Sequence, residues 1–325
     1  MNPAMNPNPV SKMNPTIETR ALAKSFGRTE VLRGIDLMVP EGAIYALVGA
    51  NGAGKTTMIK LLMNILRPTA GRATVLGTGS ERLAGKGLNR IGYVSENQEL
   101  PDAMTVGAML DFLRGFYPEW DRGLERELVR QFDLPVDRKL KHLSRGMRMK
   151  AAFAGSLAYR PRLLVLDEPF TGLDPLVRDE LIESLLERAG ETTIFLSSHD
   201  LAEIESFASH VGFLEDGRLL FSEEMTVLTE RFREVTVTLD APAPLPAGLP
   251  ATWLQAETVD CVARFVDSEY KGEASEREMA ARFAGARDVE CVAMPLRAIF
   301  LAIAKAGRIE GRARRVAAAN GRPAA

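Results

Sequence analysis

Residues 49–57 read GANGAGKTT, a glycine-rich run that ends in a lysine and two threonines. The run follows the apolar segment YALV and precedes MIKLLMNIL, so it lies between an expected strand and an expected helix. In that setting the spacing G-x-x-x-x-G-K-T predicts a phosphate-binding loop, whereas a plain turn would not require the Lys-Thr pair. Lys55 would reach the β- and γ-phosphates of a nucleotide, and the Thr56 hydroxyl would bind Mg²⁺. The expected contacts are made by Gly49, Asn51, Gly52, Gly54, Lys55, Thr56 and Thr57.

The segment LLVLDEP at 163–169 is an apolar run that ends in two carboxylates, Asp167 and Glu168. Because ligands of α/β proteins bind beyond the carboxyl ends of the strands, both acids would face the nucleotide. Asp167 would hold the Mg²⁺ shell, and Glu168 would orient or deprotonate the attacking water. An acidic strand end by itself more often caps the next helix, but the phosphate loop upstream favours the catalytic interpretation.

His199 follows another apolar run, IFLSS, and could contact the γ-phosphate, although a lone histidine is more often structural. His142 and His210 have no partners at metal-ligand spacing, so we assign them no metal. The local sequence suggests no separate Ser/His/Asp or Cys/His constellation. Nucleophilic catalysis is therefore a weak alternative.

The elements that position these residues are short apolar runs separated by longer amphipathic ones. Runs at 43–49, 90–95, 163–169 and 193–199 have the character of buried strands, which favours a mostly parallel sheet in an α/β domain. Between 101 and 142 the strand pattern stops, and apolar residues recur at helical spacing. We expect a helical subdomain inserted there.

Composition indicates two domains and a cytoplasmic setting. The chain has 325 residues and a net charge of −2, which makes nucleic acid an unexpected partner. Cys261 and Cys291 are too far apart for a zinc or redox pair and suit a reducing compartment. No apolar stretch reaches the ~18–20 residues of a membrane span, and no secretory signal is recognisable.

Proline-rich stretches mark the expected boundaries. We expect a disordered leader at 1–15, a domain with the nucleotide motifs at 16–230, a small α+β domain at 231–306 and a solvated basic tail at 307–325. The run APAPLPAGLP at 241–250 interrupts the small domain. Its expected strands are 234–239, 259–267 and 288–296, and its expected helices are 274–285 and 296–307.

Over residues 17–230 the sequence resembles the ATP-binding subunits of ABC transporters, whose nucleotide-binding domain has the P-loop NTPase fold. LSRGM at 143–147 occupies the place of the LSGGQ signature, TGLD at 171–174 resembles the D-loop, and His199 resembles the switch histidine. Phe26 falls where the family has an aromatic residue on adenine, although a buried core phenylalanine is the alternative.

The resemblance implies a head-to-tail dimer in which each ATP is held by one phosphate loop and by the partner's Ser144 and Gly146, with Asp174 of the D-loop nearby. It also implies a separate membrane permease, so that the chain would sit at the cytoplasmic face of the membrane. The forms SRGM, YVSENQ and FYPEW resemble the branch with exporter-like permeases. The Q-loop position holds Glu96, expected as a catalytic and Mg²⁺-binding residue, unless a loop shift brings Gln98 there.

Two other functions compete with transport. One is a soluble ABC ATPase without a permease, and the other is a nucleotide-gated scaffold that does not hydrolyse ATP. A single phosphate loop argues against the first, and the intact Lys55, Asp167, Glu168 and His199 argue against the second. Phe116, Tyr117 and Trp120 in the helical insert are candidates for permease contact or for the insert's own core.

Overall fold

The computed structural model describes residues 15–306, which divide into two units, one ending at Ser222 and the other beginning at Glu223. The division falls before the expected boundary at 230 because α7 (Met225–Arg231) belongs to the second unit. Arg231 binds the Glu223 carboxylate at 2.6 Å and the Ser268 carbonyl at 2.6 Å. The expected leader and tail lie, apart from Pro15, outside the described residues.

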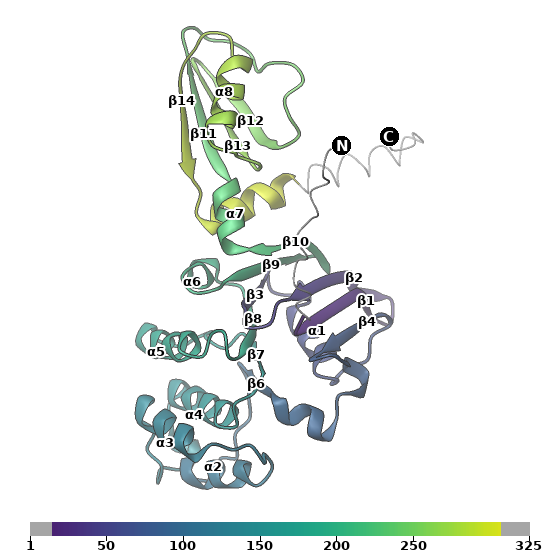
Figure 1. Ribbon diagram of the computed structural model, residues 1–325, viewed down its shortest axis with the longest axis vertical. Helices are drawn as coiled ribbons and strands as arrows, with labels where there is room; N and C mark the ends of the chain where they lie inside the picture. Colours follow the sequence, from purple (N-terminus) through teal and green to yellow (C-terminus); the bar gives the residue numbers. More distant parts are fainter. Residues whose placement is uncertain (1–14, 307–325) are drawn as a thin grey trace, which may run out of the picture. The chain divides into compact units, whose positions relative to one another are not determined.

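The first unit is built on a six-stranded sheet in the order β10-β9-β3-β8-β7-β6, whose neighbouring strands β9, β3, β8, β7 and β6 run parallel (Figure 1). The four apolar runs expected as strands all lie in this sheet. The strands are β3 (Ile44–Val48), β6 (Ile91–Ser95), β7 (Leu163–Asp167), β8 (Thr193–Ser198), β9 (His210–Glu215) and β10 (Arg218–Glu224). The expected α/β fold is confirmed.

A second, antiparallel sheet packs in the same unit in the order β2-β1-β4-β5 (Figure 1). Its strands are β1 (Ile17–Phe26), β2 (Thr29–Val39), β4 (Ala70–Val75) and β5 (Thr78–Gly79). Helix α1 (Lys55–Leu62) buries Met58, Ile59, Leu61 and Leu62 in a core shared with both sheets. That core fixes the start of α1 relative to β3.

Helices α2 (Val106–Arg114) and α3 (Arg122–Gln131) occupy the expected helical insert, together with the short turn η3 (Leu140–His142). They pack on α4 (Arg145–Leu157), which begins after the expected end of the insert at 142. Small residues on α4 permit this close packing: a Cβ on Gly155 would lie 2.8 Å from Leu113. Two further 3₁₀ turns, η1 (Ser80–Arg82) and η2 (Gly85–Arg90), precede β6.

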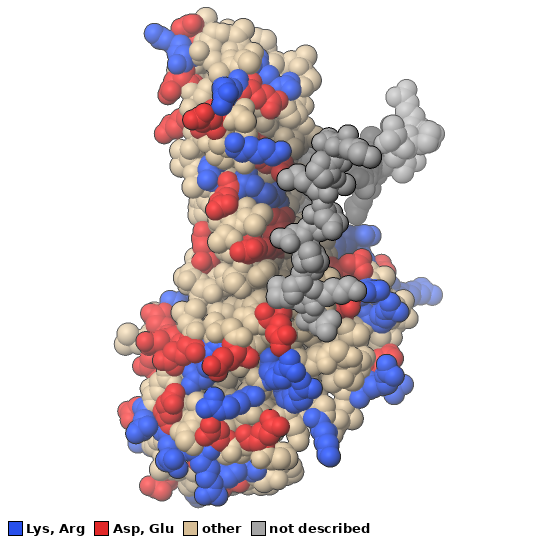
Figure 2. Space-filling view, in the orientation of Figure 1, with Lys and Arg blue, Asp and Glu red and all other residues tan. Residues whose placement is uncertain are grey.

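Helices α5 (Pro175–Leu186) and α6 (Leu201–Glu205) follow β7 and β8. Within residues 15–306, no helix is long and apolar enough to cross a membrane. Acidic and basic side chains alternate over the visible face of the first unit (Figure 2). That mixture is typical of a globular protein surface.

The second unit is an α+β fold on a four-stranded antiparallel sheet in the order β12-β13-β11-β14. It contains β11 (Arg233–Leu239), β12 (Trp253–Val259), β13 (Val262–Asp267), α8 (Glu273–Arg282), β14 (Ala286–Ala293) and a helix over 296–306. Strand β12 was not expected from the sequence. Trp253, Phe265 and Phe283 stack in the core of this unit, with Trp253 and Phe265 ring centroids 4.3 Å apart.

Candidate nucleotide site

The loop of residues 49–54 connects β3 to α1 at the carboxyl edge of the parallel sheet. Gly52 and Gly54 have φ of 84° and 112°, a region that side chains with a Cβ rarely adopt. A Cβ on Gly49 would lie 2.2 Å from the Leu214 carbonyl, whereas a Cβ on Gly52 would meet only open space. The loop is therefore anchored at Gly49, and at Gly52 its backbone is open to an approaching ligand.

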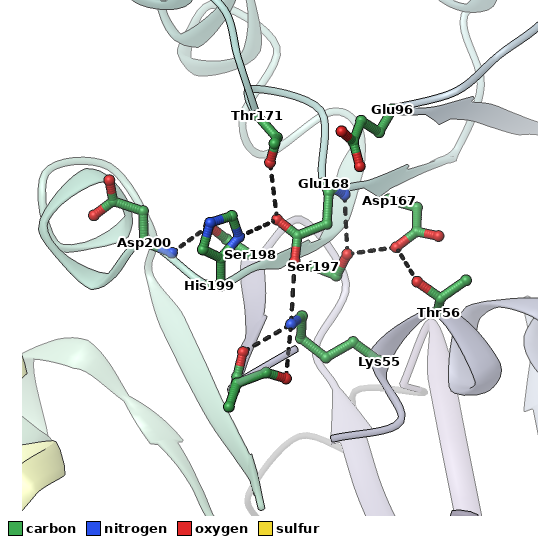
Figure 3. Close-up of polar contacts among 12 residues, drawn as sticks. Lys55, Thr56, Glu96, Asp167, Glu168, Thr171, Ser197, Ser198, His199 and Asp200 are labelled. Carbon is green, nitrogen blue, oxygen red and sulfur yellow. Dashed lines mark hydrogen bonds and ion pairs between the residues drawn. The ribbon is translucent and has the colours of Figure 1, made fainter. Parts of the chain in front are cut away.

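Lys55 begins α1 and is 6% exposed. Its ammonium donates to the carbonyls of Gly49 at 2.7 Å and Ala50 at 3.3 Å, and it pairs with Oε1 of Glu168 at 3.1 Å (Figure 3). The charge therefore lies inside the curve of the glycine loop. A phosphate bound by the loop would compete with Glu168 for this cation.

Asp167 links the phosphate loop to the neighbouring strand. Its Oδ1 accepts hydrogen bonds from the Thr56 hydroxyl at 3.0 Å and from the Ser197 hydroxyl at 2.7 Å (Figure 3). Strand β8 lies between β3 and β7, and Asp167 is opposite Ser197 in the β7–β8 register. The sheet order thus brings together residues that are far apart in the sequence.

Glu168 has an unusual backbone conformation, with φ of 51°. Its Oε2 lies 2.8 Å from Nδ1 of His199 and accepts a hydrogen bond from Thr171 at 3.2 Å, while its N–H donates to Ser197 (Figure 3). Left-handed backbone at a residue with a side chain costs on the order of 1 kcal/mol and is concentrated at functional sites. The alternative that the acids cap the next helix is wrong, because Asp174 caps α5.

The charge state of Glu168 follows from its neighbours. Burial raises its pKa, but the hydrogen bond with His199 and the positive charge of Lys55 outweigh burial and leave the pKa below the usual value. The carboxylate is therefore ionised at neutral pH. An ionised carboxylate can orient a water molecule and accept its proton.

The oxygen atoms around Thr56 fit a magnesium ion. The Thr56 hydroxyl and the Asp167 carboxylate are hard oxygen donors in contact with each other. Within the described residues, no three His, Cys, Asp or Glu side chains gather to hold a metal by themselves. This suits Mg²⁺, which commonly takes one or two protein ligands and completes its shell with phosphate and water oxygens.

Glu96 lies at the end of β6, beside Asp167 (Figure 3). Its N–H donates to the Asp167 carbonyl at 2.9 Å, and its carboxylate pairs with Arg145 at 2.9 Å. The Gln98 side chain instead accepts a hydrogen bond from the N–H of Ser95 at 3.2 Å. Of the two candidates for the Q-loop position, Glu96 is the one whose contacts lead to the acid pair.

The three expected residues of the signature and D-loop stand apart from this cluster. Ser144 caps α4 by accepting from the N–H of Met147, and Asp174 caps α5 by accepting from the N–H of Val177. Gly146 lies against Val177, which a Cβ there would approach to 3.1 Å. Within residues 15–306, the polar partners of Lys55 are Gly49, Ala50 and Glu168, and none of them is Ser144, Gly146 or Asp174.

Phe26 ends β1 and is 48% exposed, so the alternative of a buried core phenylalanine is wrong. The Lys24 ammonium lies over its ring, 5.0 Å from the centroid. Among the remaining loop residues, Asn51 is exposed in the turn and Thr57 is half-buried on α1. Sequence reasoning missed Ser197 and Thr171, although both stand within motifs that it had identified.

Known proteins resemble this chain in sequence and in fold. A family model described as "ABC transporter" matches residues 32–171. The protein is 32% identical to the ABC transporter ATP-binding protein YtrB of Bacillus subtilis over 69% of this chain and 77% of the relative. The chain belongs to the family of ABC transporter ATP-binding proteins. This ABC ATPase is also 34% identical to the bacitracin transport ATP-binding protein BcrA of Enterococcus faecalis, over 69% of this chain and 74% of that one.

A solved structure entitled as the ATP-binding subunit of an ABC transporter has a TM-score of 0.62 and 28% identity to this ABC ATPase, and covers 66% of this chain and 92% of that one. The shared fold is the nucleotide-binding cassette. This ABC ATPase binds and hydrolyses ATP, and it powers transport.

Proposed function

We propose that this ABC ATPase works as a dimer at the cytoplasmic face of the membrane and powers an exporter-type permease encoded on a separate chain. The observation that carries the catalytic part is the network in which Glu168 contacts both Lys55 and His199. The export assignment is supported by the SRGM form of the signature and by the likeness to BcrA, which is named for bacitracin transport. The alternatives are a soluble ABC ATPase without a permease and a nucleotide-gated scaffold.

The site residues would act as follows. The phosphates enter the loop of residues 49–54 and take Lys55 as a counter-ion, which frees Glu168 from that contact. Glu168 then orients the attacking water and accepts its proton, while His199 keeps the carboxylate in place and faces the γ-phosphate. Thr56, Asp167 and Glu96 would hold Mg²⁺, which neutralises charge on the β- and γ-phosphates.

The dimer would complete each nucleotide site. Ser144 is exposed at the N-terminus of α4, where backbone N–H groups can bind an anion. Leu176, next to the D-loop, is 76% exposed. The family resemblance implies that a second copy supplies Ser144 and Gly146 across the interface, and within residues 15–306 Ser144 is engaged only in capping α4. ATP bound by both copies favours the closed dimer, because only a differential affinity shifts such an equilibrium.

The permease would dock on the helical layer. A groove of about 300 Å³ runs between α2, α4 and β6, lined by Tyr93, Leu100, Met109, Leu113, Ala152 and Tyr159 among others. Phe112 on α2 and Phe116 just after that helix are 52% and 60% exposed, with ring centroids 5.0 Å apart. Exposed aromatic residues that contact each other on the surface are typical of a protein interface.

Tyr117 and Trp120 support the other interpretation, in which these rings fill the insert itself. The Tyr117 ring stacks on Tyr159 with centroids 3.8 Å apart, and the Trp120 indole donates to Glu125 at 2.6 Å. Their loss would disturb the helical layer. Phe112 and Phe116 are therefore the residues with which to test permease docking.

The test of the catalytic proposal is turnover by purified protein. We expect MgATP hydrolysis, a loss of roughly 10²–10⁴ in kcat for Glu168→Gln, and accumulation of that variant as an ATP-bound dimer in size-exclusion chromatography. Glu127→Gln, a surface carboxylate of α3, is the matched control. Near-wild-type turnover in Glu168→Gln would overturn the assigned role.

The test of the transport proposal is co-purification with the protein encoded in the neighbouring reading frame, which the proposal expects to span the membrane several times. Phe112→Ser with Phe116→Ser should reduce capture, while ATPase activity of the isolated subunit stays normal. Exposed Leu186 on α5 provides the control, as Leu186→Ser. Capture unaffected by the Phe pair would reject this surface, and a soluble neighbouring protein would favour the alternative without a permease.

A further inference from the structure

Arg145 contacts the site of its own subunit, although it stands at a position where the family signature has glycine. Its Nη2 lies 2.9 Å from Oε1 of Glu96, and the two residues are 49 positions apart in the chain. Both side chains are partly exposed, at 49% and 31%, so the pair contributes little to stability by itself. The pair matters because it joins the signature segment to the segment that follows β6.

The guanidinium of Arg145 also covers the D-loop. A Cβ built on Gly172 would lie 3.0 Å from Nη1 and 3.2 Å from Cζ of Arg145, and Gly172 has φ of 70°. The guanidinium therefore rests on a backbone surface that only glycine leaves open. One side chain thus touches the loop after β6 and the loop before α5.

Further contacts hold the first turns of α4 against α5, the helix that follows the D-loop. Gly146 lies against Val177, and Lys150, which is 8% exposed, pairs with Glu180 on α5. The signature segment and the D-loop segment are therefore packed together within one chain.

The backbone of Glu96 is bound to the end of β7, since its N–H donates to the Asp167 carbonyl. A cavity of about 220 Å³ lies beside the ion pair, lined by Ser95, Glu96, Gln98, Leu100, Arg145 and Arg148 among others, and of its two arginines Arg145 is the one that pairs with Glu96. The Glu96 carboxylate has room to turn, and Arg145 is the cation that holds it.

We propose that Arg145 is a positioning residue of its own subunit's ATPase site, which holds Glu96 beside Asp167 and the D-loop at Gly172. The inference rests on the proposed dimer, because Ser144 and Gly146 on either side of Arg145 would bind the partner's nucleotide. Arg145 thereby connects the nucleotide of one site to the metal side of the other. Energetic coupling between two nucleotide sites requires a structural element whose position depends on both of them.

The experiment compares Arg145→Gln and Arg145→Lys with Arg148→Gln in the purified protein. Arg148 is a matched control on the same helix, because it lines the same cavity but pairs with Asp102 at 2.7 Å and donates to the Leu140 carbonyl. We expect Arg145→Gln to lower kcat about 10-fold with KM for ATP changed less than about twofold, since misplaced groups cost rate more than binding. Arg145→Lys should restore most of the rate, and Arg148→Gln should retain it.

A second measurement does not depend on turnover. In the Glu168→Gln background, the Mg²⁺ concentration that gives half-maximal ATP-dependent dimerisation is measured by analytical ultracentrifugation. Arg145→Gln should raise this concentration by about 3- to 10-fold, because a Glu96 carboxylate that is free to turn is a weaker ligand. The Arg148→Gln control should leave it unchanged.

A double-mutant comparison with Glu96→Gln decides between this role and a contact with the partner's nucleotide. If Arg145 acts through Glu96, adding Arg145→Gln to Glu96→Gln lowers kcat no further. Full additivity, a rise in KM without loss of kcat, or equal effects of Arg145→Gln and Arg148→Gln would overturn the inference. Failure of wild-type protein to hydrolyse ATP or to dimerise would instead reject the proposed function.

Discussion

Nζ of Lys55 and Oε1 of Glu168 lie 3.1 Å apart, and the two side chains are only 6% and 13% exposed. The cation expected to bind phosphate and the carboxylate expected to activate water therefore neutralise each other inside the protein. Removing one partner of a buried pair leaves the other charge uncompensated, which is costly. The two functions of the site are coupled through this contact.

Lys55→Ala should weaken nucleotide binding by at least about 10-fold, because it removes the positive charge from the phosphates. It should also raise the pKa of Glu168, since the Lys55 charge is one of the causes that lower it. Equilibrium binding of a fluorescent ATP analogue measures the first effect. Lys60→Ala, on the last turn of the same helix, is the control. Equal affinities for the two variants would contradict the role of Lys55.

His199→Ala should lower kcat by about 10- to 100-fold and leave ATP affinity within about twofold, because His199 fixes the Glu168 carboxylate. Single-turnover hydrolysis and equilibrium binding separate the two effects. His142→Ala, at an exposed position in η3, should keep wild-type turnover. If His199→Ala lost binding rather than rate, the histidine would be a binding residue.

Phe26→Ala should raise KM for ATP by about 2- to 10-fold, and Phe26→Trp should restore it, as expected for a ring that stacks on adenine. The exposure of Phe26 makes it available for that contact. Met38→Ala is a suitable control, because Met38 is a similarly exposed apolar residue on β2. The preference for ATP over ribose 5-triphosphate, which lacks the adenine base, provides a second readout. An unchanged KM in Phe26→Ala would remove this residue from the site.

Glu203 on α6 predicts a pH dependence of stability. Burial is the main cause that raises its pKa to about 7; Asp200 and Glu168 add to the rise, and Arg178 opposes it. The folded state therefore binds a proton that the unfolded state has already lost between pH ~4.5 and 7. The stability that this carboxyl contributes is fully present below that range and is lost as the pH rises to about 7.

Glu203→Gln should therefore flatten the pH dependence of stability. Relative to wild type, the free energy of unfolding of the variant should increase by on the order of 1–3 kcal/mol between pH 4.5 and pH 8. Urea unfolding followed by circular dichroism at the two pH values measures the difference. Glu205→Gln, on the same short helix, is the control. Identical pH profiles for Glu203→Gln and wild type would show that Glu203 does not cause the dependence.

The sequence was sufficient for four strands of the parallel sheet and for the phosphate loop because their signals are local. Strands β3, β6, β7 and β8 are continuous apolar runs, and the loop follows one of them directly. Strand β12 was missed because it follows the proline-rich segment 241–250 and has no continuous apolar run: only Trp253 is buried, and the rest alternate between half-buried and exposed residues. Its backbone is also irregular at Gln255, which has φ of 54°.

The contacts within the site could be predicted only in part. Asp167, Glu168 and His199 can be recognised in the sequence because they follow or end apolar runs. The role of Ser197, in contrast, depends on β8 lying between β3 and β7. The Arg145–Glu96 pair depends on how α4 is placed against β6, which no local pattern encodes. The packing of Tyr117 on Tyr159 likewise appears only when the helical layer is assembled.

The stack of Trp253 with Phe265 and Phe283 gives the second unit an intrinsic fluorescence probe of its own. The chain has two tryptophans, and Trp120 is in the first unit while Trp253 is in the second. The Trp120 indole is hydrogen-bonded to a carboxylate, whereas Trp253 lies among aromatic rings beneath Arg282. Intrinsic fluorescence of Trp120→Phe and Trp253→Phe proteins therefore reports the unfolding of each unit separately, without an attached label.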